Sequence, residues 1–589
     1  MYKTFKIFYN NFCIENKTQL LFCLIFAFIS GLLEIIGIAS VIPMLKTILD
    51  ESGMSCLFPF LNHYTWQQKI VILTIGVVVL FLIKNLFMIF YHWFSFKILV
   101  KIRDHICLKL LELIQNAKYI FLLKKNSDVI VNTLDNTVRY VTTVYLFFVI
   151  QWLVNLLTII FIVFLSLSFF PITTIIVALY SFLCFLILRK IASKPTDKIN
   201  KDITKANKDN IGLLQAIIFS IKELKTLKTI DYFLNSVKAK THKVNYLEQL
   251  GYLLQTIPSN IIEILILFLL FLIILVLLST VKCYQEMVVF LGFFAVSIFR
   301  VAPIANRLLT AYTVVKSYNG SVIDLNNIHN ELISNQESDS DEYSDKKIDL
   351  NGKLQLEKVN FSYDPSNHSK TAIKDINITI NKNDFIGIVG LSGAGKTTLV
   401  DIILGLLKPI SGSYFIDNYE IKTPNQISSM FGYVSQNPCI ITGTIASNVA
   451  LGREMDYERI QEVMALCQLN EFTPESEVVE FGKNISGGQR QRIAIARALY
   501  GRPQVLILDE VTSSLDIITE KKISDVIDSL KCKCTIIAIA HRLGTLKKCN
   551  RIFYMQKGEI IANDSFENLY KNSKEFKTMV DQANITQKS

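Results

Sequence analysis

The hydrophobic residues of this chain collect in long runs before residue 320, and later apolar stretches are short and alternate with polar ones. Six of the runs are near or above the ~20 residues that an α-helix needs to cross the hydrocarbon layer. They lie at about 20–45, 69–95, 141–168, 171–189, 255–279 and 286–316. From residue 348 the alternation of strands and helices is typical of a layered α/β domain. The pattern predicts a six-helix membrane domain followed by an α/β domain.

The boundaries of these domains follow from composition. Residues 334–347 are acidic and contain one aromatic residue and no aliphatic one, which predicts a linker. We therefore expect a membrane domain over 1–333 and an α/β domain over 348–589. The segments 97–140 and 189–250 are polar and helical in pattern, and we expect them to extend into the cytoplasm and to contact a soluble motor.

The net charge of +11 is explained by membrane topology, so we do not expect a nucleic-acid partner. Segment 97–140 carries eight Lys or Arg residues and segment 189–250 carries thirteen, whereas the intervening connections carry at most one. This asymmetry predicts that both termini and the α/β domain are cytoplasmic. The first apolar run is too long for a signal-peptide core, so we expect it to be retained as a helix.

The strongest chemical motif is the stretch from Gly390 to Thr398, which fits the phosphate-binding pattern G-x-x-x-x-G-K-[ST]. A buried strand is predicted before it and a helix after it. Backbone N–H groups of the glycine-rich turn and the helix N-terminus suit phosphate oxygens. Lys396 is expected to neutralise the β- and γ-phosphates of ATP, and the Thr397 hydroxyl to ligate Mg²⁺.

Two later strands end in residues suited to ATP hydrolysis. Val505–Asp509 is an apolar strand followed by Glu510, so Asp509 is expected in the Mg²⁺ shell and Glu510 is placed to orient or deprotonate the attacking water. Another buried strand ends at His541. A histidine at such a position is more often structural, but beside a γ-phosphate it acts as a sensor that links water, phosphate and Glu510.

The stretch Asn484–Arg492 resembles the signature of ATP-binding-cassette transporters, with Ile485 where leucine is commoner. Other motifs occur in the order that is typical of that family. Gln436 matches the glutamine of its Q-loop, and residues 513–516 resemble its D-loop. Residues 480–482 resemble the loop through which exporters contact membrane helices. The resemblance, which includes the six spans, implies ATP and Mg²⁺ as cofactors, with Gln436 as a metal ligand beside Thr397 and Asp509 and with Tyr363 stacked on adenine. The implied nucleotide contacts are Tyr363, Gly390, Ser392, Gly393, Gly395, Lys396, Thr397, Thr398, Ser486, Gly487, Gly488, Gln489 and Asp516.

One cassette and six spans correspond to half a transporter of this family. The resemblance therefore implies a homodimer with two ATP molecules between the cassettes, in which Ser486 and Gly488 contact ATP held by the partner's phosphate loop. Closure would turn the membrane helices outward, and hydrolysis at Glu510 would reset them. Catalytic roles are expected for Glu510, His541 and Gln436.

The membrane domain resembles the bacterial flippases for lipid-linked oligosaccharides of protein N-glycosylation, through residues 33–45, the loop after them, and Arg300 and Arg307. This resemblance implies a multi-pass protein of the bacterial inner membrane that moves a polyprenyl-pyrophosphate oligosaccharide or another anionic amphipathic lipid. Lys84, Arg300 and Arg307 are candidates for cargo contact, since cations at membrane depth suggest a path that accepts negative charge; snorkelling is the alternative.

Several alternatives remain open at this stage. An exporter of drugs or other lipids would share the architecture, and a peptide exporter is less expected because no protease domain precedes the first span. An ATP-gated channel or regulator is disfavoured by Glu510 and His541. Glu34 either packs with a partner or takes part in transport. Residues 46–68 form a surface helix or an ordinary loop, and Cys56 and Cys283 are expected as free thiols rather than a disulfide.

Overall fold

A computed structural model of the chain divides into two compact units, each of which we describe by itself. The helical unit comprises residues 1–117 and 125–336, and the α/β unit comprises 118–124 and 337–589. The structure describes residues 2–40, 44, 47–48, 64–125, 127–169, 175, 198–199, 202–203, 205–207, 209–280, 284–337, 348–364, 371–422, 426–479, 482–511, 517–531, 533–540 and 542–588.

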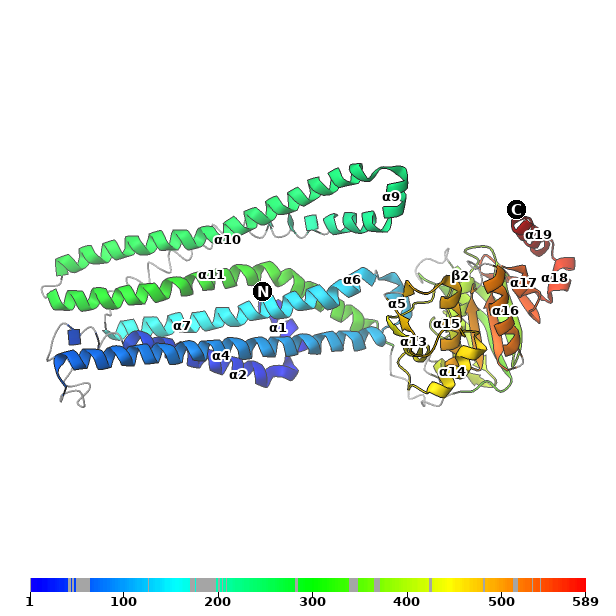
Figure 1. Cartoon of the computed structure of the whole chain (residues 1–589), viewed down its shortest axis with the longest axis horizontal. Helices are drawn as coiled ribbons and strands as arrows, with labels where there is room; N and C mark the ends of the chain where they lie inside the picture. Colours follow the sequence, from blue (N-terminus) through cyan, green and yellow to red (C-terminus); the bar gives the residue numbers. More distant parts are fainter. Residues whose placement is uncertain are drawn as a thin grey trace. The chain divides into compact units, whose positions relative to one another are not determined.

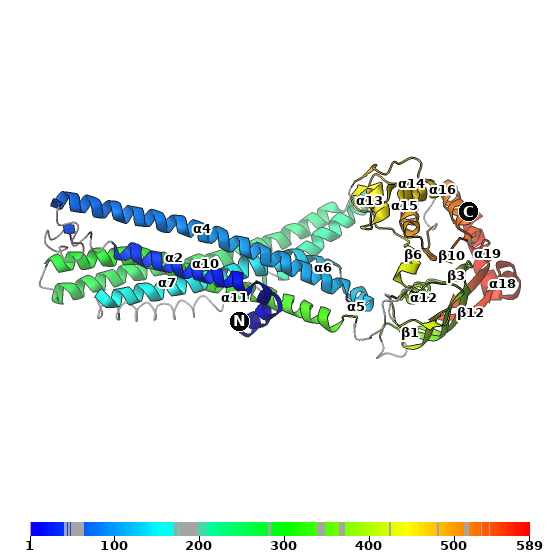
Figure 2. The ribbon, with the colours of Figure 1, turned by 90° about the horizontal axis from the view of Figure 1, so that it is seen from below.

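The helical unit is built from long helices that run side by side (Figures 1 and 2). After the short helix α1 (Tyr2–Phe8), its main members are α2 (Lys17–Ala39), α4 (Trp66–Gln115), α7 (Phe147–Phe169), α10 (Ile230–Thr280) and α11 (Tyr284–Ser334). Helix α2 packs on α4 and α7, and α11 packs on α7 and α10. With 50 residues, α4 is roughly 75 Å long, so it extends well beyond a hydrocarbon layer.

The predicted spans correspond to parts of these helices wherever the structure describes them. Within the described residues, three helices are long and apolar enough to cross a membrane: Lys3–Glu34, Trp66–Gln115 and Ser127–Phe164. The predicted spans at 255–279 and 286–316 lie inside α10 and α11. The predicted span at 171–189 lies outside the described residues, apart from Ile175.

The polar excursions are helical, as predicted, over their described parts. Helix α4 continues to Gln115, and α5 (Tyr119–Lys124), α6 (Ser127–Asn132) and π-helical turns at Thr133–Thr137 and Tyr140–Leu146 follow it. In the second excursion α9 (Ile221–Leu227) precedes α10. Helix α5 is grouped with the α/β unit, although the sequence places it inside the membrane domain.

The α/β unit contains a six-stranded sheet in the order β12-β11-β3-β10-β9-β6. Strands β6, β9, β10, β3 and β11 run parallel, and β12 pairs with β11 antiparallel. Their bounds are β3 Phe385–Gly390, β6 Phe431–Val434, β9 Val505–Asp509, β10 Thr535–Ile539, β11 Arg551–Gln556 and β12 Glu559–Asp564. Because neighbouring parallel strands end at one edge, β3, β6 and β9 bring their following residues together there.

Smaller elements complete this unit. A four-stranded sheet has the order β2-β1-β4-β5, and β7 pairs with β8. These strands are β1 Lys353–Ser362, β2 Thr371–Asn381, β4 Ser411–Ile416, β5 Tyr419–Glu420, β7 Gly443–Thr444 and β8 Glu477–Val478. The helices are α12 Lys396–Ile403, α13 Ile445–Ala450, α14 Tyr457–Leu466, α15 Gly487–Tyr500, α16 Ile517–Leu530, α17 Leu543–Leu546, α18 Phe566–Asn572 and α19 Lys574–Lys588.

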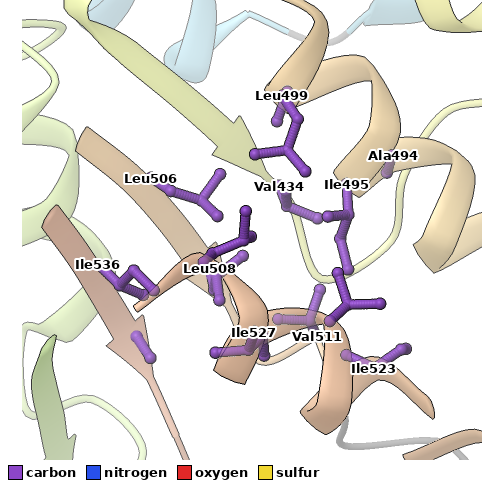
Figure 3. Close-up of a cluster of buried hydrophobic side chains, with 14 of the residues drawn as sticks. Val434, Ala494, Ile495, Leu499, Leu506, Leu508, Val511, Ile523, Ile527 and Ile536 are labelled. Atoms are coloured by element: carbon purple, nitrogen blue, oxygen red, sulfur yellow. The ribbon is translucent and has the colours of Figure 1, made fainter. Parts of the chain in front are cut away.

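The two faces of the six-stranded sheet bury separate cores because side chains alternate along each strand. On one face Leu506 and Leu508 of β9 pack with Ile495 of α15 and Ile523 of α16 (Figure 3). On the other face Val505 and Ile507 belong to a core that includes Leu399, Ile402 and Ile403 of α12. This sandwich fixes β9 between α12 and α15, so the residues after β9 are held from both sides.

Candidate nucleotide-binding site

The phosphate loop runs from the end of β3 to the start of α12, as the sequence predicts. Gly393 and Gly395 have φ angles of +78° and +98°, in the left-handed region that favours glycine. A Cβ atom at Gly395 would lie 2.8 Å from the carbonyl oxygen of Ala372. The glycines therefore let the backbone turn sharply and keep the loop's N–H groups free of side chains, with Ser392 and Gly393 exposed.

Lys396 is buried at the start of α12, and only 7% of it is exposed. Its Nζ donates hydrogen bonds to the carbonyl oxygens of Gly390, at 2.8 Å, and Leu391, at 3.2 Å. Burial lowers the pKa of the ammonium, and the nearby carboxylates of Glu510 and Asp509 partly offset this shift. The loop therefore holds a cation where the β- and γ-phosphates of ATP would lie.

The residues after β6 and β9 meet at the same edge of the sheet. Gln436 Nε2 donates a hydrogen bond to Glu510 Oε2 at 2.6 Å, and Tyr433 Oη donates one to Asp509 Oδ2 at 3.2 Å. Glu510 has a φ angle of +50°, and its N–H donates to Ile539 O of β10. The backbone turn after β9 therefore directs the two adjacent acids to different partners.

The residues at this edge fit a magnesium ion. Thr397 is exposed at the second position of α12, and it offers the hydroxyl oxygen that the sequence predicts as a magnesium ligand. Hydroxyl, carboxylate and amide oxygens are hard ligands of the kind that Mg²⁺ prefers. Within the described residues no group of three His, Cys, Asp or Glu side chains forms a metal cluster. Such a donor set suits a metal that takes its remaining ligands from phosphate and water.

Tyr363 lies beside the start of α12, where the sequence places the adenine contact. Its Oη is 3.1 Å from Thr398 Oγ1, and its ring meets Phe361 edge-on with centroids 5.1 Å apart. Tyr119 and Ile120 of α5 pack against the same core as Tyr363. The stacking role of Tyr363 stays a prediction, but its hydroxyl contacts the first turn of α12, which follows the phosphate loop.

The signature segment forms the N-terminus of α15. Ser486 Oγ accepts a hydrogen bond from Gln489 N, and Gln489 Oε1 accepts one from Ser486 N, so the two residues form a capping box. Ser486 and Gly487 are exposed, and Gly488 is buried. The start of α15 is thus exposed at Ser486 and Gly487, and a helix N-terminus of this kind suits an anion.

Sequence reasoning missed three residues of this site. Tyr433 contacts Asp509, Asp401 of α12 is 8% exposed, and Tyr119 approaches from α5. Burial and then Asp509 raise the pKa of Asp401 to about 6, and burial, Asp401 and Tyr363 raise that of Tyr119. Strand alternation carried a signal for Tyr433, since it pairs with Ile507 and shares a sheet face with Asp509.

Several predicted residues lie outside the part of the chain that the structure describes. These are Asp516 and His541, the D-loop, Glu480 and Phe481, the loop at 49–63, and Cys56 and Cys283. Arg300 lies in α11, but its side chain is not among those described. Their roles stay predictions.

The other two cargo candidates occupy contrasting places. Arg307 of α11 is exposed. Lys84 of α4 is 4% exposed, and its Nζ lies 2.7 Å from Glu34 Oε2 of α2. The ammonium also lies 5.6 Å from the centroid of the Phe81 ring. Of the two alternatives for Glu34, the structure thus supplies a packing partner, Lys84, and the carboxylate of Glu34 balances the charge of the Lys84 ammonium.

Comparisons with known proteins agree with this geometry. Residues 373–513 match the family model described as ABC transporter. The chain is 36% identical over 252 residues to the "Putative export ATP-binding/permease protein" of Rickettsia bellii, which is 41% of this chain and 44% of that protein. It is also 36% identical over 234 residues to the leukotoxin translocation ATP-binding protein LktB of Mannheimia glucosida, or 38% of this chain and 33% of LktB. The chain thus covers less than half the length of these curated relatives.

A solved structure extends the likeness to the whole fold. The structure of a bacterial Atm1-family ABC exporter with ATP bound has a TM-score of 0.78 and 16% sequence identity, and it covers 96% of this chain and 98% of that chain. The chain therefore has the fold of an ABC exporter, with a helical membrane domain and an α/β nucleotide-binding domain, as the sequence predicted.

Proposed function

We propose that this chain is one half of an ATP-driven exporter, which works as a homodimer and hydrolyses ATP at Glu510. The observation that carries the proposal is the contact of Gln436 Nε2 with Glu510 Oε2, at the sheet edge where Lys396 and Asp509 also lie. A base and a metal ligand at the end of β9 and a phosphate-binding cation at the start of α12 therefore gather at one edge. The match of residues 373–513 to the ABC transporter model supports the assignment.

Each residue has a separate task in the proposed reaction. Lys396 holds the β- and γ-phosphates, while Thr397 and Asp509 would hold Mg²⁺, which when bound neutralises charge on the same phosphates. Glu510 orients the attacking water and accepts its proton. Gln436 fixes the direction of the Glu510 carboxylate through their hydrogen bond. Positioning and charge stabilisation of this kind supply most of the catalysis in phosphoryl transfer.

Two features support a homodimer. The capped N-terminus of α15 exposes Ser486 and Gly487, which suits contact with ATP held by a second cassette. In the helical unit the second cytoplasmic excursion exposes large apolar side chains, with Ile218 and Leu227 each 68% exposed and Phe219 85% exposed. Exposed apolar groups of this size outside the membrane are typical of a surface that another subunit covers.

The proposed cargo is an anionic amphipathic lipid, specifically a polyprenyl-pyrophosphate oligosaccharide. Its support is the resemblance of residues 33–45 to the oligosaccharide flippases, together with Arg300 and Arg307, which are seven residues apart and so share one face of α11. Guanidinium groups pair well with pyrophosphate. Since Lys84 is paired with Glu34, the argument depends chiefly on α11.

An exporter of drugs or other lipids is the second candidate, because the fold likeness and the export names of the relatives say nothing of the cargo of this chain. LktB is named for leukotoxin translocation, but it matches only 38% of this chain. The exposed Arg307 favours anionic cargo over neutral or cationic drugs.

The motor assignment is tested by replacing Glu510 with glutamine, which keeps the side chain's size and removes the base. We expect ATP hydrolysis by the purified dimer to fall at least about 100-fold, since base and water-positioning groups typically contribute 10²–10⁴-fold. Binding of ATP, measured with a fluorescent analogue, should change less than about twofold, because Glu510 does not hold the phosphates. Glu477→Gln, at the exposed first residue of β8, is the matched control and should hydrolyse ATP normally. Unchanged hydrolysis in Glu510→Gln contradicts the assignment.

A further inference from the structure

The catalytic pair Gln436–Glu510 has a further contact that its role in hydrolysis does not require. Gln436 belongs to the loop after β6, residues 435–441, which we call the Q-loop. The main-chain oxygen of Gln436 accepts a hydrogen bond from Gln491 Nε2 at 2.7 Å. Gln491 lies on α15, five residues after Ser486, which caps this helix. One residue thus contacts the signature helix through its backbone and the catalytic glutamate through its side chain.

The environment of Gln491 shows that this hydrogen bond is the principal polar contact of its side chain. Gln491 is 5% exposed, and its Oε1 is buried with no hydrogen-bond partner among the described residues. Burying an amide without satisfying it costs free energy. Among the described residues, the hydrogen bond from Gln491 Nε2 to the Q-loop is thus the contact that offsets the cost of burying this amide.

A second residue of α15 contacts the same loop. Arg497 Nη1 donates to the main-chain oxygen of Cys439 at 2.9 Å, and its Nε donates to Asn448 O at 2.8 Å. Asn448 of α13 in turn exchanges hydrogen bonds with Ile441 at the end of the loop. Helix α15 therefore holds the Q-loop at both ends, with Gln491 at the end nearest to Glu510.

We infer that Gln491 is a positioning residue that makes the placement of Glu510 depend on the position of α15 in the same chain. This inference rests on the proposed function, in which Ser486 at the start of α15 contacts ATP held by the partner cassette. When the dimer closes and α15 moves with Ser486, Gln491 carries Gln436 with it, and Gln436 sets the direction of Glu510. Occupancy of one ATP site is thereby transmitted to the catalytic base of the other.

The direct test uses dimers in which a single Glu510 is active. Mixed dimers of the full-length chain are purified through two affinity tags, and the reference dimer carries Glu510→Gln in one chain only. In the first arrangement Gln491→Met is placed in the chain that keeps Glu510. In the second it is placed in the chain that carries Glu510→Gln. Methionine has nearly the same volume as glutamine and donates no hydrogen bond.

The inference predicts that only the first arrangement is impaired. Its kcat for ATP should be about 3- to 10-fold below the reference, the range that corresponds to one hydrogen bond, while KM changes less than about twofold. The second arrangement should match the reference. Impairment confined to the second arrangement would mean that Gln491 acts on the partner's site through Ser486. Equal rates in the two arrangements would mean that Gln491 has no chain-specific role. Each of these results overturns the inference. A wild-type dimer without ATPase activity would instead refute the proposed function.

Gln491→Glu supplies a readout that loss of packing would not move. An ionised carboxylate cannot donate to the Gln436 carbonyl, but a protonated one can, and burial raises the pKa of an introduced carboxyl. We expect the kcat of this variant, relative to wild type at each pH, to rise severalfold between pH 8 and pH 6, while that of Gln491→Met stays level. A level ratio for Gln491→Glu overturns the inference even if Gln491→Met does not fold.

Discussion

Two carboxylates, Asp509 at the end of β9 and Asp401 of α12, lie close enough to interact electrostatically. Asp509 accepts a hydrogen bond from Tyr433, whereas Asp401 of α12 is buried close to Asp509. Burial first and then the Asp509 charge raise the pKa of Asp401 from 3.8 to about 6. The folded protein thus binds a proton that the unfolded chain has released between about pH 4 and pH 6. Stability that the protonated form contributes is lost as the pH rises through 6.

Asp401→Asn should remove this loss, because asparagine resembles the protonated carboxyl and carries no charge. Without nucleotide and with EDTA present, we expect the variant to unfold at a higher temperature than wild type at pH 8 and by a smaller margin at pH 5, which lies inside the interval between the unfolded and folded pKa values over which the loss develops. The difference at pH 8 corresponds to on the order of 2–3 kcal/mol. Melting curves followed by intrinsic fluorescence at the two pH values measure it.

Asp417 provides a control of opposite sign. Although burial alone would raise its pKa, hydrogen bonds from the backbone N–H groups of Lys353, Asn351 and Gly352 lower it overall. Asp417→Asn should therefore lower the melting temperature by the same amount at pH 5 and pH 8, since Asp417 is ionised at both. An Asp401→Asn difference that does not vary with pH would contradict the account of Asp401.

The sequence predicts the chemistry of single residues better than their contacts. Lys396 and Asp509 follow from motifs, because a phosphate site needs those side chains at fixed places along the chain. Tyr433, Asp401 and Gln491 do not, because their importance comes from neighbours 76, 108 and 55 residues away in the chain: Asp509, Asp509 and Gln436. Such neighbours are set by strand order and helix packing, which no local pattern specifies.

At the scale of elements, the ion pair of Glu34 and Lys84 joins α2 to α4 in the region that the sequence assigns to the membrane. Both side chains are largely removed from solvent, with 12% and 5% exposed. A buried charge without its partner typically costs 3–5 kcal/mol, whereas replacing both partners with uncharged groups is often neutral. The pair therefore specifies how α2 sits on α4.

Lys84→Met should lower the melting temperature in detergent and the yield of folded dimer, because it removes the ammonium that lies 2.7 Å from the largely buried carboxylate of Glu34. Adding Glu34→Gln to the same chain should restore most of both. Lys97→Met is the control on the same helix, because Lys97 is exposed and lies over the Trp93 ring. A Lys84→Met protein as stable as wild type would refute the structural role of the pair. Loss of cargo transport in the stable double variant would support the predicted contact of Lys84 with cargo.

The element boundaries show where hydropathy alone stops being informative. The predicted span at 69–95 is the apolar part of α4, but the helix continues to Gln115. Residues 96–115 are rich in Lys, Leu, Glu and Arg, which favour helix, and they contain no glycine or proline that would end it. The break comes at Asn116 and Ala117, after which α5 begins. The sequence predicts that the excursion contacts a motor, and the structure groups α5 with the α/β unit through Tyr119 and Ile120.

At the scale of the whole molecule, the order of apolar runs and of nucleotide motifs is enough to predict a membrane domain joined to an α/β motor. The fold likeness over 96% of the chain confirms that architecture. What sequence cannot supply is the cargo, because a transport path is lined by side chains from several helices whose facing is decided by packing. The proposed anionic cargo therefore rests on the resemblance of residues 33–45 and on Arg300 and Arg307 of α11, of which Arg307 is exposed.

The most direct measurement is ATP-driven movement of a polyprenyl-pyrophosphate oligosaccharide in proteoliposomes, where external ATP reaches outward-facing cassettes. A membrane-impermeant oxidant reports how much glycan remains in the outer leaflet, and Glu510→Gln protein is the control. Our account predicts that ATP protects the glycan in wild-type vesicles and not in the variant. Glycan that stays accessible, while amphiphilic drugs stimulate ATP hydrolysis by the same wild-type protein, would contradict the cargo, and equal protection in both proteins would contradict the motor.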